Sequence, residues 1–303
     1  MLTWIPALKR EFFKRKSNSL EAFLIQVYLI IVFPVLLWQR ILPFSYIQRG
    51  ILSMICMTNF MKVHSYLAIA KEHPVSTGEL SAFARFYLAP TFIYSREYPL
   101  VKERIKFWFI VEKLCMSLGC CFLAYILIEH FVTPPFLARK QVGFVETLLQ
   151  LVIPLYLTNI LLFFGIFEGL SNAAAEATRF ADREFYSDWW NSANMEEFAR
   201  KWNKIVHAFL FAHVYLRIRQ EKQIPKHLAT FTTFLLSAFA HELVMATFTG
   251  RMNFVFFGMQ MMQIPLIFLG RIRSVKQKPV MGNVFVMACL FLGPPLLLLS
   301  CSE

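Results

Sequence analysis

Long runs of apolar residues constrain this chain more than any other feature of its sequence. A helix that crosses about 30 Å of hydrocarbon needs roughly 20 such residues, and lipid offers no hydrogen-bond partner to an open backbone. The sequence is 57% hydrophobic, well above an ordinary soluble domain, so the runs predict membrane-spanning helices. The seven predicted spans lie near residues 22–39, 50–70, 107–132, 147–167, 228–250, 252–270 and 280–302.

The residue composition favours helices over a membrane barrel. The chain holds 33 Phe and 14 Pro against 11 Gly, which suits bulky, lipid-facing helices better than short alternating strands. We therefore predict an all-α, polytopic helical bundle that forms one membrane-embedded domain over residues 1–303. Two of its spans are weaker than the rest, because Lys62 with His64 and Glu112 with Lys113 interrupt them.

The distribution of Lys and Arg predicts the orientation of the spans, because cytoplasmic loops carry an excess of both. With the N-terminus inside, the cytoplasmic segments hold 5, 6, 9 and 4 of these residues, whereas the opposite connectors hold 2, 2 and 1. The cytoplasmic segments are residues 1–21, 71–106, 168–227 and 271–279. The net charge of +12 is thus mostly a topology signal, and no nucleic-acid partner is expected. No cleavable signal peptide is expected ahead of the first span.

Two ionisable residues, His241 and Glu242, lie near the middle of the fifth predicted span. Such a residue costs about 2.5 to 3.5 kcal/mol on insertion scales, so it usually faces the bundle interior and has a use. A neutral imidazole in a dry cavity can act as a general base for a hydroxyl group. A structural histidine that hydrogen-bonds between helices is the alternative.

The cytoplasmic connector 168–227 has too many aromatic residues for an ordinary loop. Its stretch "REFYSDWWNS" (residues 183–192) sets four aromatic residues beside Asp188 and Asn191, which look buried. After it, Asn194 and Glu197 are spaced to cap a helix. Apolar residues then recur at helical spacing at Phe198, Trp202, Ile205, Phe209 and Leu216. We predict one amphipathic helix at the membrane surface, with Glu197 paired to Lys201.

The cysteines and histidines do not predict a metal site. The six cysteines lie mainly in spans and form no CxxC pair, which favours a role as small apolar residues. His207 and His213 are six residues apart, so they do not share one face of a helix.

Three motifs occur in an order typical of one enzyme family. They are "FYSDWWN" (185–191), "WNKIVH" (202–207) and "SAFAHE" (237–242). As a set they resemble the motifs of the membrane-bound O-acyltransferases that esterify sterols or diacylglycerol. Other segments that read like this family are "YLAPTFIYSREYP" (87–99), "FADREFY" (180–186), "GMQMMQIPL" (258–266) and "GNVFVMACLFLGPP" (282–295).

The resemblance implies roles for individual residues. It places the catalytic histidine on His241 and its partner asparagine on Asn203, and it makes the FYSDWWN stretch part of an acyl-CoA site. The substrate-binding residues that it implies are Phe185, Tyr186, Asp188, Trp189, Trp190, Asn191, Trp202 and Glu242. Residues 62–65 match the family's second helix only loosely and are assigned no role.

The implied reaction transfers a fatty acyl group from acyl-CoA to a sterol hydroxyl, without a metal or other cofactor. Diacylglycerol is the alternative acceptor, because "FADREFYSDWW" and "QMMQIPL" fit that branch as well. "APTFIYSREYP", "LGCCFLAYILIEHFVTPPF" (118–136) and "KQKPVMGNV" favour the sterol branch. Alternatives from other classes are a transporter, which can also place His and Glu in a span, and a non-catalytic scaffold.

The resemblance also implies a multi-pass protein of the endoplasmic reticulum membrane that assembles as a dimer or tetramer. Family members usually carry a long N-terminal region and further spans ahead of the residues matched here. The chain is therefore expected to be either a compact enzyme or a part of a longer one.

Overall fold

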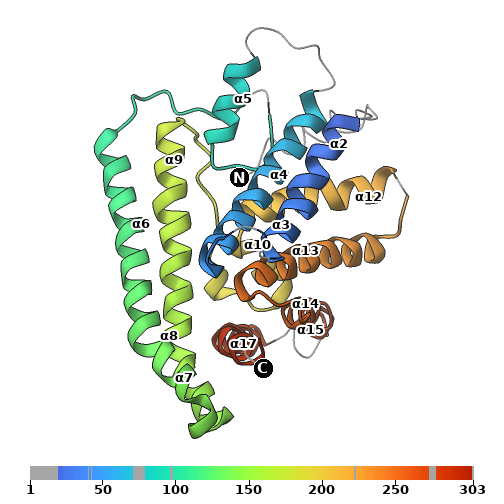
Figure 1. The fold of residues 1–303 in the computed structure, drawn as a ribbon. Coiled ribbons are helices and arrows are strands. Elements are labelled where there is room, and N and C mark those ends of the chain that lie inside the picture. The colour runs from blue at the N-terminus through green and yellow to red at the C-terminus, as the bar shows by residue number, and fades with distance from the viewer. Residues whose placement is uncertain are drawn as a thin grey trace. The chain divides into compact units, whose positions relative to one another are not determined.

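The computed structural model describes residues 20–39, 41, 43–70, 79–95, 98–221, 223–272 and 278–301 (Figure 1). These residues form helices and the connections between them, with one isolated β-bridge between Leu100 and Phe180 and no strand among them. The all-helical class is therefore confirmed. Residues 1–19 of the predicted basic N-terminus lie outside the described part of the chain.

Backbone contacts divide the chain into two compact units. The first comprises Met1–Tyr98 and Ile205–Ile264, and the second comprises Pro99–Lys204 and Pro265–Glu303. Each unit is thus built from two separate stretches of sequence. The organisation of residues 1–303 as one domain stays a prediction.

The first unit holds the long helix α13 (Lys226–Thr249), which packs against α4 (Tyr46–Ala70) and α14 (Val255–Met261). Pro225 precedes α13, and Gly250 ends it in the left-handed conformation (φ 72°) that glycine adopts without strain. Its other helices are α2 (Leu20–Val27), η1 (Tyr28–Val32), α3 (Phe33–Trp38), α5 (Glu79–Leu88), α11 (Lys204–Phe209), η5 (Leu210–Tyr215) and α12 (Leu216–Glu221).

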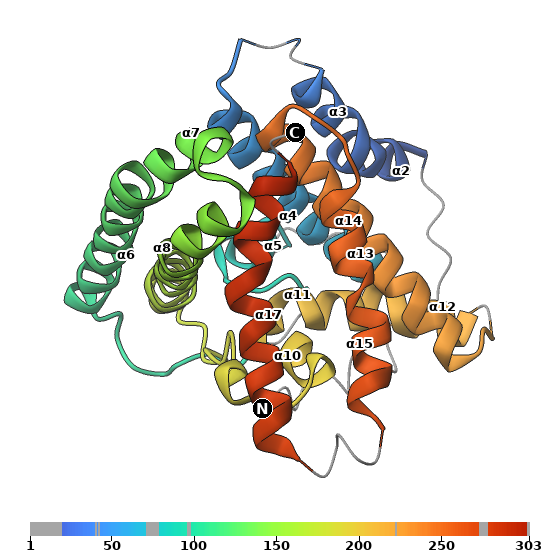
Figure 2. The same ribbon diagram turned by 90° about the horizontal axis from the view of Figure 1, so that it is seen from below.

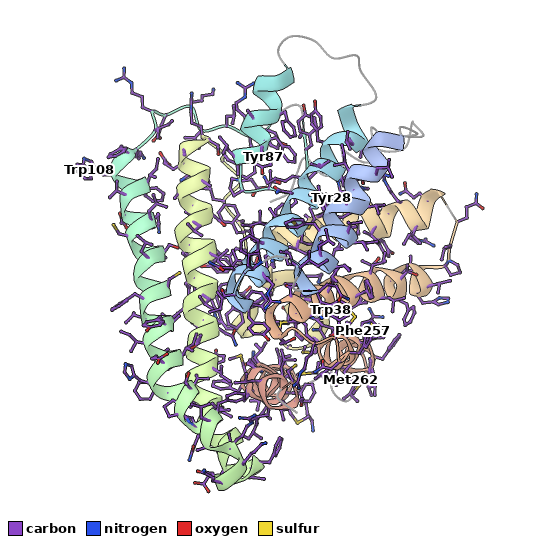
Figure 3. The ribbon with its side chains drawn as sticks, in the orientation of Figure 1. Tyr28, Trp38, Tyr87, Trp108, Phe257 and Met262 are labelled. Atoms are coloured by element: carbon purple, nitrogen blue, oxygen red, sulfur yellow. The ribbon has the colours of Figure 1, made fainter. Side chains whose placement is uncertain are left out.

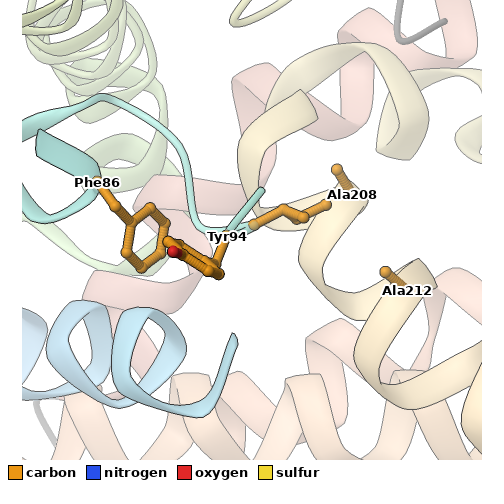
Figure 4. Close-up of a cluster of buried hydrophobic side chains, with 5 residues drawn as sticks. Phe86, Tyr94, Ala208 and Ala212 are labelled. Atoms are coloured by element: carbon orange, nitrogen blue, oxygen red, sulfur yellow. The ribbon is translucent and has the colours of Figure 1, made fainter. Parts of the chain in front are cut away.

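A core cluster of the first unit joins segments that are far apart in the sequence. Phe86, Ile93 and Tyr94 pack with Ala208 and Ala212, and the rings of Phe86 and Tyr94 are 5.2 Å apart (Figure 4). Because both alanines are small, the aromatic side chains can approach the backbone of the helix that carries them.

The second unit is built around α6 (Phe107–Leu127) and α8 (Phe144–Phe164), which lie side by side in Figure 1. Gly169 lies in η3 (Gly165–Leu170), directly after α8, and allows η3 to lie close to α6, because a Cβ atom there would lie 2.7 Å from Ser117 Cβ. Figure 2 shows α17 (Pro279–Ser300) alongside α8. The other helices are η2 (Ile128–Val132), α7 (Thr133–Val142), η3 (Gly165–Leu170), α9 (Ser171–Ala177), η4 (Trp189–Asn191) and α10 (Met195–Trp202); the boundary between the units falls within α15 (Gln263–Gly270).

Each of the seven predicted spans is largely helical where the structure describes it, although residues 252–254 of the sixth are not helical and the spans differ in length and polarity. In the described part of the chain, four continuous helices are long and apolar enough to cross a membrane, at Phe107–Val142, Phe144–Ala177, Lys226–Thr249 and Pro279–Ser300. The helices Leu24–Trp38 and Val255–Gly270 are apolar but shorter. The chain is thus a multi-pass membrane protein, while the number of seven spans stays a prediction.

Large apolar side chains on the outside of these helices fit a lipid environment. Trp108 is 79% exposed and points away from the ribbon of α6 (Figure 3). Leu118 on the same helix is 71% exposed, and Val280 on α17 is 77% exposed. Exposure on this scale would be unfavourable in water, because burying such a side chain is worth about 1.5 to 3 kcal/mol.

α4 is 25 residues long but is not among these four apolar helices. Its Lys62 interrupts the apolar pattern without interrupting the helix. The side chain is 6% exposed, and Nζ donates hydrogen bonds to the carbonyl oxygens of Phe86 (3.0 Å), Ala89 (2.7 Å) and Thr91 (3.0 Å). A buried ammonium group is tolerated here because each of its three N–H groups has an acceptor.

Candidate active site

His241 lies in α13, within the motif "SAFAHE", and its side chain is exposed in the first unit. Its Nδ1 atom is 2.7 Å from the carbonyl oxygen of Ser237, one helical turn earlier. Because a carbonyl oxygen only accepts, Nδ1 must carry the proton in this contact. In the neutral ring Nε2 then holds the lone pair, which is the tautomer that a general base acting through Nε2 requires.

Glu242 has the opposite environment, because it is buried with 1% exposure. Its two carboxylate oxygens accept hydrogen bonds from the backbone N–H groups of Phe254 (2.8 Å) and Phe257 (2.9 Å). Phe254 precedes α14 in the left-handed conformation (φ 58°), so Glu242 satisfies donors at the start of that helix. The sequence predicts Glu242 as a substrate-binding residue, whereas the structure shows its carboxylate engaged by the protein backbone.

The contact between α13 and α14 also reaches the His241 ring. The ring of Phe256 lies edge-on to it, with centroids 5.8 Å apart. Glu242 therefore fixes the beginning of the helix that carries a direct neighbour of His241. Neither Phe256 nor the Ser237 carbonyl can be identified from the sequence, because any residue type provides the latter.

In the second unit, two of the family-like motifs are joined by backbone hydrogen bonds. The Ser187 N–H donates to the Lys201 carbonyl, and the Lys204 N–H donates to the Phe185 carbonyl, each at 2.9 Å. The end of α10 is thereby held against the FYSDWWN stretch, with Asn203 inside the joined region.

These bonds overturn the prediction of one continuous helix from Asn194 to Leu216. α10 ends at Trp202, Asn203 is non-helical (φ −138°, ψ 86°), and α11 begins at Lys204. A helix running through this point would direct the Lys204 N–H to the carbonyl four residues earlier. That N–H instead bonds to Phe185, so a tertiary contact breaks the helix at the predicted catalytic asparagine.

The start of α10 agrees with the sequence. The Asn194 side chain accepts from the Glu197 N–H at 2.9 Å, and a Glu197 carboxylate oxygen accepts from the Ala193 N–H at 2.9 Å. Lys201 Nζ lies 2.8 Å from the Glu197 carboxylate. The predicted cap and the predicted ion pair are both confirmed.

The aromatic residues of FYSDWWN form a packed cluster with α8 and α10. Trp189 is 2% exposed, and its ring centroid lies 4.8 Å from that of Trp202 and 5.5 Å from that of Phe163. Phe163 and Trp202 are 4.4 Å apart. Phe185 is also buried, whereas Trp190 is 47% exposed. Within the second unit, Trp190 is therefore better placed than Trp189 to meet a ligand.

Asp188 and Asn191 are exposed in the described unit, which corrects the expectation that they are buried. The Asp188 carboxylate lies 2.9 Å from Lys201 Nζ. This ammonium group lowers the pKa of Asp188 and that of Glu197 below their ordinary values. Lys201 thus ties the FYSDWWN stretch to α10 by charge as well as by its backbone carbonyl.

Tyr186 is partly buried beside this cluster. Its hydroxyl donates to a Glu168 carboxylate oxygen at 2.7 Å. Burial, followed by the hydrogen bond to Glu168, raises the pKa of Tyr186, so the phenol is retained as a donor. The predicted substrate-binding side chains therefore divide into a buried framework and an exposed set, the latter comprising Asp188, Trp190 and Asn191.

A second histidine environment lies inside the first unit. His213 is 4% exposed; its Nε2 is 2.9 Å from Ser65 Oγ, and its ring centroid is 5.1 Å from that of His64. The same Ser65 oxygen accepts from the Tyr94 N–H at 2.8 Å. The sequence analysis assigns no role to His64, Ser65 or His213, and the structure makes them part of a buried polar network. Among the residues that the structure describes, no three His, Cys, Asp or Glu side chains converge on a metal position.

The fold and these motifs define a class of membrane enzyme. The membrane-bound O-acyltransferase family profile matches residues 53–302, and the chain belongs to this family.

The chain is also similar to individual relatives. The chain is 36% identical over 228 residues to sterol O-acyltransferase 2 of Saccharomyces uvarum, a match that covers 71% of this chain and 35% of the relative. It is 34% identical over 222 residues to a probable sterol O-acyltransferase 1 of Schizosaccharomyces pombe, covering 71% and 41%. Diacylglycerol O-acyltransferase 1-1 of Oryza sativa subsp. japonica is 28% identical over 281 residues, covering 90% and 51%. The chain thus spans about half or less of the length of these relatives.

Proposed function

We propose that this protein transfers a fatty acyl group from acyl-CoA to the hydroxyl of a sterol, forming a steryl ester and CoA. The observation that carries the proposal is the contact of His241 Nδ1 with the Ser237 carbonyl, inside the family-like motif. It leaves Nε2 as the basic atom of the neutral ring, as deprotonation of an alcohol requires.

The proposed reaction is a direct transfer. His241 Nε2 accepts the hydroxyl proton while the acceptor oxygen attacks the thioester carbonyl, and the carbonyl oxygen takes up negative charge. The attack gives a tetrahedral intermediate. Its collapse breaks the carbon–sulfur bond, and the leaving CoA thiolate takes its proton from the imidazolium ring. Atoms and charges balance without an acyl-enzyme, a metal or another cofactor.

Asn203 is proposed to donate a hydrogen bond to the developing oxyanion or to the thioester. A donor of this kind typically contributes about 10²- to 10³-fold in kcat when it is held in place beforehand. The non-helical backbone of Asn203 and the Lys204–Phe185 bond support this role, because they give the residue a fixed and distinctive conformation.

The FYSDWWN stretch is proposed to bind acyl-CoA from the cytoplasmic side. The exposed Trp190 offers an aromatic surface, and the connector 168–227 supplies cations for the CoA phosphates. Glu242 is proposed to act indirectly, through the start of α14. The resemblance further suggests an endoplasmic reticulum location and a homo-oligomer as parts of the same proposal.

Sterol is proposed as the acceptor because the two sterol O-acyltransferases are more similar in sequence than the plant relative. Their identities are 36% and 34%, against 28% for the diacylglycerol O-acyltransferase. Diacylglycerol is retained as the second candidate because that relative matches 90% of this chain.

A thiol-release assay on the purified, membrane-reconstituted protein tests the activity. Release of CoA from oleoyl-CoA should require an acceptor lipid, and the His241→Ala variant should retain less than about a tenth of the turnover. His227→Ala is the matched control, because His227 is exposed near the start of the same helix. Turnover by His241→Ala above that level would exclude His241 as the base.

A competition experiment tests the acceptor. Labelled oleoyl-CoA is supplied with equal amounts of sterol and diacylglycerol, and the products are separated by chromatography. Steryl ester should predominate. Predominant triacylglycerol would overturn the choice of acceptor and leave the proposed role of His241 intact.

A further inference from the structure

The turn formed by Trp189–Asn191 is held by a residue that lies about ninety positions further along the chain. Asn283 Nδ2 donates to the Trp190 carbonyl at 2.7 Å and to the Ser192 carbonyl at 3.1 Å. Both partners are carbonyl oxygens, which only accept, so the orientation of the Asn283 amide is fixed by its environment. One side chain thus serves the carbonyl oxygen of Trp190, within the turn, and that of Ser192, directly after it.

The side chains of the turn do not provide an equivalent fastening. Trp189 and Ser192 are 2% and 0% exposed, yet Trp189 Nε1 and Ser192 Oγ make no hydrogen bond within the described part of the chain. Within the turn, the Ser192 N–H bonds to the Trp189 carbonyl at 3.1 Å. The side-chain donor to the Trp190 and Ser192 carbonyl oxygens comes from Asn283 of α17.

The residue before Asn283 makes this contact possible. Gly282 is buried against the loop after the turn, and a Cβ atom placed there would overlap the Ala193 carbonyl oxygen. This obstacle is backbone, so it cannot move aside as a flexible side chain can. Only glycine lets the start of α17 approach closely enough for the Asn283 amide to reach both carbonyls.

The end of α15 secures the same region from a second point. Arg271 Nε and Nη2 lie 2.9 Å and 2.7 Å from one carboxylate oxygen of Glu196 in α10. At Gly270 a Cβ atom would lie 3.0 Å from Asn194 Cβ. The stretch from Gly270 to Asn283 therefore contacts residues 190–196 at both of its ends.

We infer that Asn283, brought into contact by Gly282, is a positioning residue for the acyl-CoA site. Its amide sets the conformation in which the exposed Trp190 and its neighbours meet the acyl donor, and it takes no part in proton transfer. The inference deepens the proposed function and rests on it for the identity of the ligand. Loss of the Asn283 amide should therefore weaken acyl-CoA binding and leave the chemical step nearly unchanged.

Three substitutions separate hydrogen bonding from packing. Asn283→Leu keeps the approximate shape and removes both N–H groups. Asn283→Asp keeps the shape but turns carboxylate oxygens toward the two carbonyl oxygens. It should therefore weaken the hold on the turn more than Asn283→Leu does. Asn283→Gln keeps both donors on a side chain that is one methylene longer and should retain most of the wild-type behaviour. Val284→Ala is the matched control, because Val284 is the next residue of α17 and 62% exposed.

Two measurements on the detergent-purified 303-residue chain distinguish the variants. Hydrogen exchange of peptides covering residues 183–200 reports the hold on the turn without requiring activity. Exchange should rise about tenfold in Asn283→Leu, as expected for the loss of two hydrogen bonds. In the thiol-release assay, KM for oleoyl-CoA should rise about tenfold in Asn283→Leu, with kcat within about twofold of wild type.

Unchanged exchange in Asn283→Leu would overturn the anchoring role, as would an Asn283→Asp variant that behaves like wild type. A fall in kcat with unchanged KM would overturn the assignment to acyl-CoA binding. Absence of thiol release by the wild-type protein would instead refute the proposed function, while the exchange result would still decide whether Asn283 holds the turn.

Discussion

Replacement of Glu242 by alanine should destabilise the first unit substantially. The carboxylate is 1% exposed and accepts two hydrogen bonds, from the Phe254 and Phe257 N–H groups. Leaving a buried donor without a partner costs about 1 to 3 kcal/mol. Phe254 itself is 50% exposed, so water can reach part of this helix start. We expect Glu242→Ala to lower the free energy of unfolding by about 2 to 4 kcal/mol in total.

The Glu242→Gln variant should lose only part of the stability that Glu242→Ala loses. A glutamine side chain has the same length, but its amide oxygen can accept from one N–H while its NH₂ group faces the other. About half of the loss, roughly 1 to 2 kcal/mol, is therefore expected. Glu146→Ala is the control, because Glu146 is exposed and its described hydrogen bond is to a neighbouring Gln150 side chain. Its effect should stay within about 0.5 kcal/mol.

Thermal unfolding of detergent-purified protein, followed by the fraction that remains monodisperse, measures the difference. At about 2 °C for each kcal/mol in a chain of this size, Glu242→Ala should melt about 4 to 8 °C below wild type. The melting temperature of Glu242→Gln should lie midway between those of wild type and Glu242→Ala. Equal melting of the alanine and glutamine variants, or wild-type melting of Glu242→Ala, would refute the capping role derived from the two hydrogen bonds.

Three further outcomes follow from the described contacts. Asn203→Ala should lower turnover more than acyl-CoA affinity in the thiol-release assay; an equal loss of affinity with unchanged turnover would reassign the residue to binding. Lys62→Met should lower the melting temperature, because three carbonyl oxygens lose a buried donor; wild-type melting would show that these bonds add nothing. The depressed pKa values of Asp188 and Glu197 stabilise the fold above the ordinary carboxyl pKa, and this stabilisation is lost as the pH falls through the lowered values. Proteolysis of the connector should accelerate under those acidic conditions, and Lys201→Met should weaken that acid dependence; an unchanged dependence would argue against the Lys201 contacts as its cause.

The agreement between sequence and structure is closest where the governing interactions are local. Asn194 and Glu197 are three residues apart, and their cap forms as predicted because a helix start needs partners that nearby side chains can supply. The Glu197–Lys201 pair forms for the same reason, since residues four apart are neighbours on a helix.

The same local pattern fails at Asn203. Nothing in the spacing of apolar residues marks a helix end there, because the cause is the Phe185 carbonyl, which lies eighteen positions earlier in the sequence. The sequence predicts a buried Asp188 for a related reason: the neighbouring Trp189 is buried, but the Asp188 carboxylate turns outward, where Lys201 meets it.

By itself the sequence determined that this protein is helical and lies in a membrane, since apolar segments of that length leave the backbone no other way to satisfy its hydrogen bonds. It also pointed to His241 as an ionisable residue within an apolar helix. The tautomer of His241 follows from a contact within one turn of α13, whereas only the tertiary structure decided the engagement of Glu242 with α14 and the hold of Asn283 on the FYSDWWN turn. These depend on which backbone groups come within about 3 Å of a side chain, and backbone groups carry no residue-specific pattern that a sequence can display.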